Sequence, residues 1–160
     1  MLRRSLIALA ILVMLPAAAS AGSFTYYGPQ LGFSQSPDQF VVGGHLKWNA
    51  VAPKLDFVPG VDLGLGDNNT QVSMNGDFHY KITSNSDWQP YVGGGVGIHF
   101  DSVTDRHGET TGREARAGGH FIVGAGVPTA GRSRFFTEMK LGFGDSPELK
   151  VMAGWNYRSH

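Results

Sequence analysis

Residues 71 to 82 carry the clearest pattern in the chain, an alternation of apolar or small side chains with polar ones. One set comprises Val72, Met74, Gly76, Phe78, Tyr80 and Ile82, and the other comprises Gln71, Ser73, Asn75, Asp77, His79 and Lys81. Successive side chains of a β-strand point to opposite faces, so a period of two predicts a strand with two different faces.

Similar alternation recurs in eight segments of about ten residues each. They cover residues 24–34, 39–50, 55–65, 71–82, 88–100, 116–127, 134–143 and 149–158. Polar connections rich in Gly, Pro, Asn, Asp and Ser separate most of them. An even number of antiparallel strands brings the last strand beside the first, and closure removes the unpaired sheet edges. The sequence therefore predicts an all-β fold, an eight-stranded antiparallel up-and-down β-barrel.

The first 21 residues follow a different pattern. A positive start at Arg3 and Arg4 precedes an apolar run at 6–15 and the small-residue ending Ala19-Ser20-Ala21. These three parts are typical of a cleavable signal peptide. The run is shorter than the roughly 20 apolar residues of a spanning helix, which disfavours a membrane anchor. We expect a signal peptide over 1–21 and one exported domain over 22–160.

The composition argues against thiol chemistry and against nucleic-acid binding. The chain has no cysteine, so neither disulfides nor thiolate chemistry are expected. Its 13 basic and 13 acidic residues balance, whereas nucleic-acid binders usually carry a basic excess, so we expect no nucleic-acid partner. After the first segment no apolar stretch is long enough for a spanning helix. A mature chain that crosses a membrane must therefore do so with strands.

Charge and glycine indicate which face lines the barrel. The polar face carries Lys47, Asp62, Asp77, Glu138 and Lys140 near the middle of strands, together with many glycines. A narrow lumen can hold paired charges and small residues, whereas glycine only weakens a strand that faces solvent. We therefore expect a lumen filled by polar residues and glycine, in which Asp62 or Asp77 pairs with Lys47, Lys81 or Lys140. Such a lumen is not a wide pore.

Large aromatic residues of the apolar face collect toward the ends of the strands, which is typical of the two interfaces of a membrane. Trp48, Tyr80, Trp88, Trp155 and Tyr157 fall at one level, and Phe33, Phe40, Phe100 and Phe143 at the other. With the amino terminus in the periplasm, the long polar stretch 101–115 lies outside the cell. The sequence thus predicts an outer-membrane β-barrel. The alternative is a soluble periplasmic barrel of lipocalin type that binds an apolar ligand inside.

Two segments resemble a known family. Residues 88–97, Trp-Gln-Pro-Tyr-Val-Gly-Gly-Gly-Val-Gly, and the ending Trp155-Asn156-Tyr157 are similar to strands of small outer-membrane barrels of the OmpA-like transmembrane domain and OmpX/Ail type. The resemblance implies a Gram-negative outer membrane and, as partners, its lipid, its lipopolysaccharide and the outer-membrane assembly machinery. The family commonly ends on an aromatic residue, whereas Arg158, Ser159 and His160 follow Tyr157 here. We expect a monomer.

Four histidines, His45, His79, His99 and His120, fall on the polar face. His99 and His120 flank the 101–115 stretch on neighbouring strands, and with Asp101 they would form a ligand set for a transition metal. A histidine that is hydrogen-bonded within a polar lumen explains the same pattern more simply. We therefore assign no metal-binding residue and no cofactor.

Ser73, Asp77 and His79 share a face and offer a nucleophile, an acid and a base. Along one strand Ser73 and His79 would lie roughly 20 Å apart, so no triad forms unless another strand supplies a member. Small outer-membrane barrels include lipid-A-modifying enzymes, but we find no matching His-x-Ser motif and expect no enzyme.

We expect the protein to contact other molecules mainly through the 101–115 loop, which carries Asp105, Arg106, His107, Glu109, Arg113 and Glu114. The resulting expectation is a structural or surface-interaction role.

Overall fold

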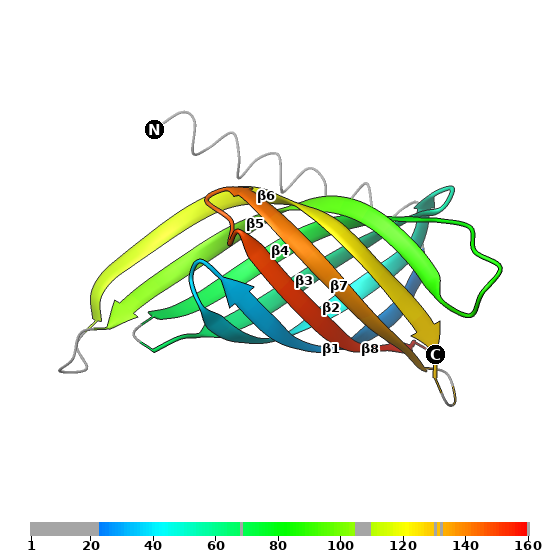
Figure 1. Ribbon diagram of the computed structural model, residues 1–160, viewed down its shortest axis with the longest axis horizontal. Coiled ribbons are helices and arrows are strands. Elements are labelled where there is room, and N and C mark those ends of the chain that lie inside the picture. The colour runs from blue at the N-terminus through cyan, green and yellow to red at the C-terminus, as the bar shows by residue number, and fades with distance from the viewer. Residues whose placement is uncertain (1–22, 68, 105–109, 130, 132, 160) are drawn as a thin grey trace.

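The computed structural model describes residues 23–159 except 68, 105–109, 130 and 132. The expected signal peptide, residues 1–21, lies outside this range. Eight strands make up the fold (Figure 1). They are β1 (Ser23–Gln35), β2 (Gln39–Ala52), β3 (Leu55–Leu65), β4 (Asn69–Lys81), β5 (Gln89–Thr104), β6 (Thr110–Pro128), β7 (Ser133–Gly144) and β8 (Leu149–Arg158). The described residues contain no helix that is long and apolar enough to cross a membrane.

The strands form one closed barrel in sequence order. Each pairs antiparallel with the next, and β1 closes the ring on β8 through pairs such as Tyr27 with Tyr157. The predicted up-and-down barrel is therefore confirmed. Because the strand number is even, Ser23 and Arg158 lie at the same end, which we call the terminal end; the β5–β6 hairpin projects from the opposite hairpin end (Figure 1).

The stretch 101–115 departs from its expected loop conformation. Strand β5 continues to Thr104 and β6 begins at Thr110, with Asp101 paired to Glu114 and Phe100 to Ala115. The prediction of a long loop here was wrong. Beyond the apolar band both faces of a strand meet water, so the alternation that marks a strand disappears although its backbone still pairs. Residues Asp105, Arg106, His107 and Glu109 lie outside the described part of the chain.

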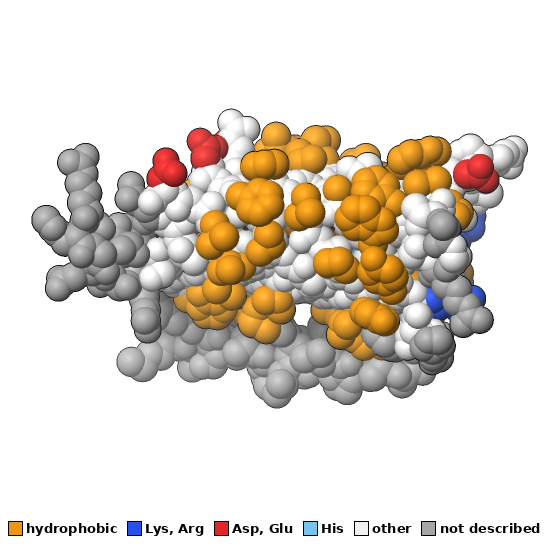
Figure 2. Space-filling model, turned by 90° about the horizontal axis from the view of Figure 1, so that it is seen from below, with side chains coloured by type: hydrophobic (Ala, Val, Ile, Leu, Met, Phe, Trp, Pro, Cys, Tyr) orange, Lys and Arg blue, Asp and Glu red, His pale blue; other side chains and the backbone are white. Residues whose placement is uncertain are grey.

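The barrel is polar inside and apolar outside. Asp56 and Asp62 are 0% and 1% exposed, whereas the outward-facing Val96 and Phe121 are 60% and 64% exposed. On the face seen in Figure 2, hydrophobic side chains cover the middle of the molecule and charged ones lie toward its two ends. In a water-soluble protein large apolar side chains concentrate in the interior, so this distribution is inverted.

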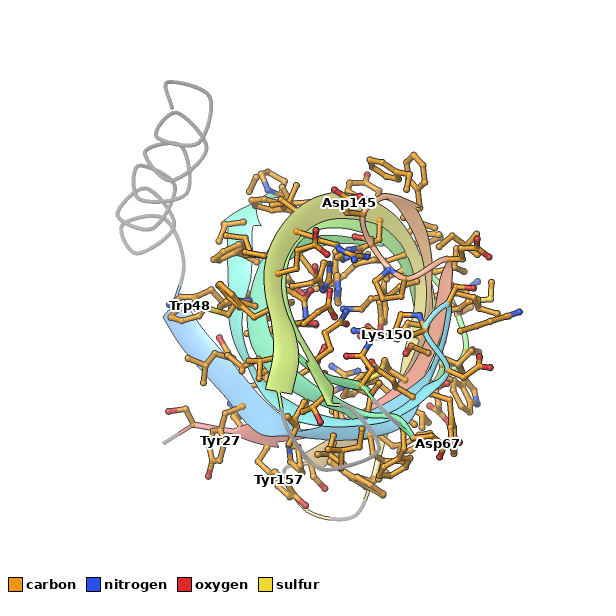
Figure 3. All side chains as sticks on the ribbon, turned by 90° about the vertical axis from the view of Figure 1, so that its left-hand side faces the viewer. Tyr27, Trp48, Asp67, Asp145, Lys150 and Tyr157 are labelled. Atoms are coloured by element: carbon orange, nitrogen blue, oxygen red, sulfur yellow. The ribbon has the colours of Figure 1, made fainter. Side chains whose placement is uncertain are left out.

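Aromatic side chains pair at both ends of the outer face. Phe33 and Phe40 have ring centroids 5.3 Å apart at the hairpin end. Tyr27 and Tyr157 lie 6.2 Å apart at the terminal end, where Figure 3 shows them pointing away from the lumen. Three of the residues predicted for the two aromatic levels, Phe33, Phe40 and Tyr157, therefore lie on the outer face near the strand ends.

Candidate functional site in the polar interior

Asp77 of β4 is the centre of the largest charged cluster in the lumen. Its Oδ2 lies 2.5 Å from Lys140 Nζ of β7, and its Oδ1 lies 2.8 Å from His120 Nε2 of β6. Lys140 Nζ also approaches Glu138 Oε1 at 3.3 Å. One ammonium group thus faces two buried carboxylates, and the predicted pairing of Asp77 with Lys140 is confirmed.

Tyr91 of β5 extends this cluster toward the terminal end. Its hydroxyl donates to Glu138 Oε2 at 2.8 Å, and its ring stacks on His79 with centroids 4.5 Å apart. A Cβ at the facing Gly124 would lie 2.5 Å from Tyr91 Cζ, so glycine is needed for the ring to fit. Tyr91 is not among the candidate residues that the sequence pattern indicates. The only available signal was its place on the glycine-rich face of residues 88–100.

Asp62 of β3 forms a second cluster, with partners other than those expected. Its Oδ1 accepts from Gln30 Nε2 at 2.6 Å, and its Oδ2 accepts from Asn75 Nδ2 at 2.9 Å and Lys150 Nζ at 3.3 Å. Figure 3 shows Lys150 pointing into the barrel. The prediction that Asp62 or Asp77 pairs with one of Lys47, Lys81 and Lys140 is met by Asp77, whereas the cation that pairs with Asp62 is Lys150. Which side chains meet across a lumen depends on the strand tilt, which residue alternation does not reveal.

Asp56 of β3 forms a third cluster, in which it pairs with two lysines, Lys47 and Lys81. Lys47 Nζ lies 3.0 Å from its Oδ2 and Lys81 Nζ lies 2.9 Å from its Oδ1. The Ala50 amide also donates to Oδ1 at 3.1 Å. Together the three clusters neutralise the buried charges of the lumen with groups from all eight strands, as buried charges require.

The suggested metal ligands do not come together. His99 bonds to Ser73 Oγ through Nδ1 at 2.9 Å, whereas His120 bonds to Asp77. Asp101 accepts instead from Gln71 Nε2 at 2.8 Å. Within the described residues no group of three or more His, Cys, Asp or Glu side chains is placed to hold a metal ion.

The neighbouring strand does supply a histidine to Ser73, but no triad results. His99 Nε2 faces Ser146 Oγ at 3.3 Å, while Asp77 is engaged by Lys140 and His120. Ser146 comes from the β7–β8 turn, which folds back over the hairpin end of the lumen. A Cβ at Gly118 would lie 2.6 Å from Ser146 Oγ, so this glycine makes room for the turn.

At the hairpin end, Arg116 lies beyond the last pair of β6 with β7, which joins Gly118 to Gly144. Its Nη2 donates to Glu114 Oε2 at 2.6 Å, and its Nε lies 3.7 Å from Asp101 Oδ2. The hydrogen bond that Arg116 donates to Glu114 raises the pKa of this exposed guanidinium above its ordinary value. These charged side chains form the described part of the projecting hairpin surface.

The lumen is not completely filled. A cavity of about 70 Å³ reaches the terminal end, where Tyr26, Asn49, Lys81, Gln89, Arg134 and Asn156 line it. A second cavity of about 10 Å³ lies beneath Ser146 and Pro147. The larger cavity has room for several water-sized groups and the smaller for about one.

Comparison with known proteins identifies the architecture. The chain is similar to Neisserial surface protein A (NspA), with a TM-score of 0.67 and 11% identity over 85% of this chain and 96% of that one. It is also similar to a de novo designed transmembrane β-barrel, with a TM-score of 0.54 and 18% identity over 86% and 96% of the two chains. At these identities the likeness shows the fold, that of an eight-stranded membrane barrel. No protein-family model matches the sequence, and no curated protein is significantly similar to it.

Proposed function

We propose that the protein is an outer-membrane β-barrel of a Gram-negative bacterium with a structural or surface-interaction role. The observation that supports this most is the inverted polarity of the barrel. Outward-facing side chains such as Val96 and Phe121 are more than half exposed, while Asp62 and Asp77 are buried and paired inside. Such an exterior is stable against lipid acyl chains and unstable against water.

The remaining expectations fit this role. Residues 1–21 act as a cleaved export signal. The terminal end of the barrel faces the periplasm, and the hairpin end faces the outside of the cell. The contact partners are outer-membrane lipid, lipopolysaccharide and the assembly machinery, and the barrel works as a monomer. The OmpA-like and OmpX/Ail resemblance is consistent with the same placement.

The lumen supports neither a wide pore nor lipid-modifying catalysis. Side chains such as Lys140, Glu138 and Tyr91 cross-link its middle through buried hydrogen bonds. Ser73 and His99, the closest approach to a nucleophile and a base, are 2% and 1% exposed and face the lumen. Acyl chains outside the barrel cannot reach them. We therefore place the functional surface at the rim, on the β5–β6 hairpin with Glu114 and Arg116.

Fractionation of cells that produce the full chain tests this proposal. We expect the mature protein in the outer-membrane fraction, with a mobility on SDS gels that changes on heating because closed barrels resist SDS until they are heated. Recovery in the soluble fraction after osmotic shock would instead support the periplasmic ligand-binding barrel. That alternative requires an apolar interior, whereas the interior of this barrel carries charge.

A further inference from the structure

The two ends of the barrel carry opposite charge. At the hairpin end, the fully exposed charged groups among the described side chains are five carboxylates and one guanidinium, those of Asp38, Asp67, Glu114, Asp145, Glu148 and Arg116. At the terminal end they are two cations and one carboxylate, those of Lys54, Arg158 and Asp87. On the face seen in Figure 2, the visible basic side chains lie toward the terminal end. The sign of the charge therefore changes along the barrel axis.

The mouth of the lumen adds positive charge to the terminal end. Lys47 and Lys81 share the single carboxylate of Asp56, which leaves one positive charge. Arg134 also lines the larger cavity there, and it makes no ion pair with any described residue. Together with the exposed rim groups, these side chains give the terminal end an excess of three positive charges within the part of the chain that the structure describes.

The exposed cations lie next to aromatic side chains of the outer face. Lys54 immediately precedes Leu55, whose partner on β4 is Tyr80. Arg158 immediately follows Tyr157, whose ring lies near that of Tyr27 with centroids 6.2 Å apart. Aromatic side chains of a membrane barrel collect at the level of the lipid headgroups. In a bilayer, Lys54 and Arg158 therefore lie at headgroup depth in the leaflet that surrounds the terminal end.

Electrostatic attraction extends from the terminal end to the surrounding headgroups. Its range is about 10 Å at about 0.1 M salt, so the cations at the rim and those in the mouth of the lumen both contribute. Each Lys or Arg near an anionic lipid surface strengthens binding roughly fivefold. The acidic hairpin end, by contrast, repels the same lipids.

We propose that the terminal end of the barrel binds anionic phospholipids, such as phosphatidylglycerol, in preference to zwitterionic ones. Lys54 and Arg158 contact the headgroups, and the cations in the mouth of the lumen add to the attraction. The proposal rests on the membrane placement proposed above, to which it adds a lipid class and an end of the barrel. A lipid fits this surface better than an acidic polypeptide does, because the cations adjoin aromatic rings that face the bilayer.

The tryptophans provide a fluorescent reporter at the terminal end. All three tryptophans of the chain, Trp48, Trp88 and Trp155, lie in the terminal half of a strand or directly before one. Bromine quenches tryptophan fluorescence at short range, so lipids with the same brominated chains and different headgroups report which lipid surrounds this end. The full-length mature protein is folded into vesicles of phosphatidylglycerol and phosphatidylcholine in which one or the other lipid is brominated. Both leaflets have the same composition, so the terminal end meets the same lipids in either orientation.

We expect phosphatidylglycerol to be preferred roughly fivefold or more at about 20 mM salt, and the preference to disappear at about 0.5 M salt. Equal quenching by the two lipids at low salt would overturn the proposal and assign the excess charge to an acidic polypeptide instead. Quenching by neither lipid would contradict the membrane barrel itself, so failure of the lipid preference is distinguishable from failure of the proposed function.

Charge variants at the two ends of the barrel provide matched controls. The double variant Lys54→Gln with Arg158→Gln should reduce the preference to about twofold or less. Arg116→Gln removes a cation from the hairpin end and should leave the preference unchanged. Asp87→Asn should increase the preference, whereas Asp145→Asn at the hairpin end should not. Heat-dependent gel mobility shows that each variant is folded; a folded double variant with unchanged preference would contradict the assignment.

Discussion

Lys140 Nζ lies 2.5 Å from Asp77 Oδ2, and this contact joins β7 to β4 through the middle of the lumen. Both side chains are more than nine-tenths buried, and Glu138 shares the same ammonium group. Removing one partner of a buried pair leaves an uncompensated charge, which destabilises far more than the pair itself stabilises.

We expect Lys140→Met to lower the free energy of unfolding by about 3–5 kcal/mol, because Asp77 and Glu138 then lose their shared cation. Urea unfolding of the protein in lipid vesicles, followed by tryptophan fluorescence, measures the change. The double variant Asp77→Asn with Lys140→Met should recover part of the loss. A stability of Lys140→Met within about 1 kcal/mol of the wild type would show that water already screens this cluster.

The exposed pair at the hairpin end should behave differently. Arg116 and Glu114 are bonded at 2.6 Å, but their side chains are 49% and 67% exposed. Such exposed pairs contribute little to stability because water screens them. Arg116→Gln is therefore expected to leave the unfolding free energy nearly unchanged in the same urea experiment. A loss as large as that of Lys140→Met would mean that the hairpin surface supports the barrel.

Glycines on the two faces of the sheet should respond oppositely to alanine. A Cβ at Gly95, which faces the lumen, would overlap Asp77 Oδ1 and lie 2.8 Å from His120 Nε2. Gly95→Ala should cost about 1–3 kcal/mol by displacing that hydrogen bond. At the outward Gly76 the nearest atom would be Phe57 Cε2 at 3.7 Å. Gly76→Ala should be neutral or stabilise by up to about 1 kcal/mol. Thermal unfolding of both variants measures the two changes in stability. Equal changes would contradict the assignment of Gly95 to the lumen and Gly76 to the outer face.

A charge introduced on the outer face tests its contact with lipid. Val96 lies midway between the two aromatic levels and is 60% exposed, whereas Phe33 is 66% exposed at the hairpin end. Val96→Lys should cost about 2–4 kcal/mol in a bilayer, and Phe33→Lys about 0–1 kcal/mol. Unfolding in vesicles measures both. If the two lysines had the same small effect, the middle of the barrel would not lie in hydrocarbon.

The absence of cysteine from the sequence allows a direct test of orientation. Glu114 is exposed at the hairpin end, and Asn85 is exposed in the connection between β4 and β5 at the terminal end. In intact cells a membrane-impermeant maleimide should label Glu114→Cys and spare Asn85→Cys. Lysed cells should label both. The reverse pattern would place the terminal end outside.

The barrel was predictable because alternation is a local signal. Each strand of the apolar band needs one face for the outside and one for the lumen, so residues such as Met74 and Asn75 reveal their faces by position alone. The alternation of apolar and polar residues disappears where a strand extends beyond the apolar band. Asp101 and Glu114 pair as strand residues beyond the apolar band, in a segment that reads as a loop.

The contacts inside the lumen could not be read from the chain. Lys150 and Asp62 are 88 residues apart, and they meet only because the strands tilt around a closed ring. Ser146 reaches His99 because Gly118 leaves space for a turn that the sequence marks only as polar. Local alternation predicts the side of the sheet on which a group lies, and the geometry of closure decides which group it meets.

The seam between β1 and β8 makes completion of the chain a condition for folding. The strand that pairs with Tyr27 contains Tyr157, so the ring cannot close until the last strand has been made. A copy that stops early exposes two unpaired edges, which are sites of aggregation and proteolysis. Closure thus acts as a check on chain length, because only a copy that includes β8 can hide its hydrogen-bonding groups from lipid.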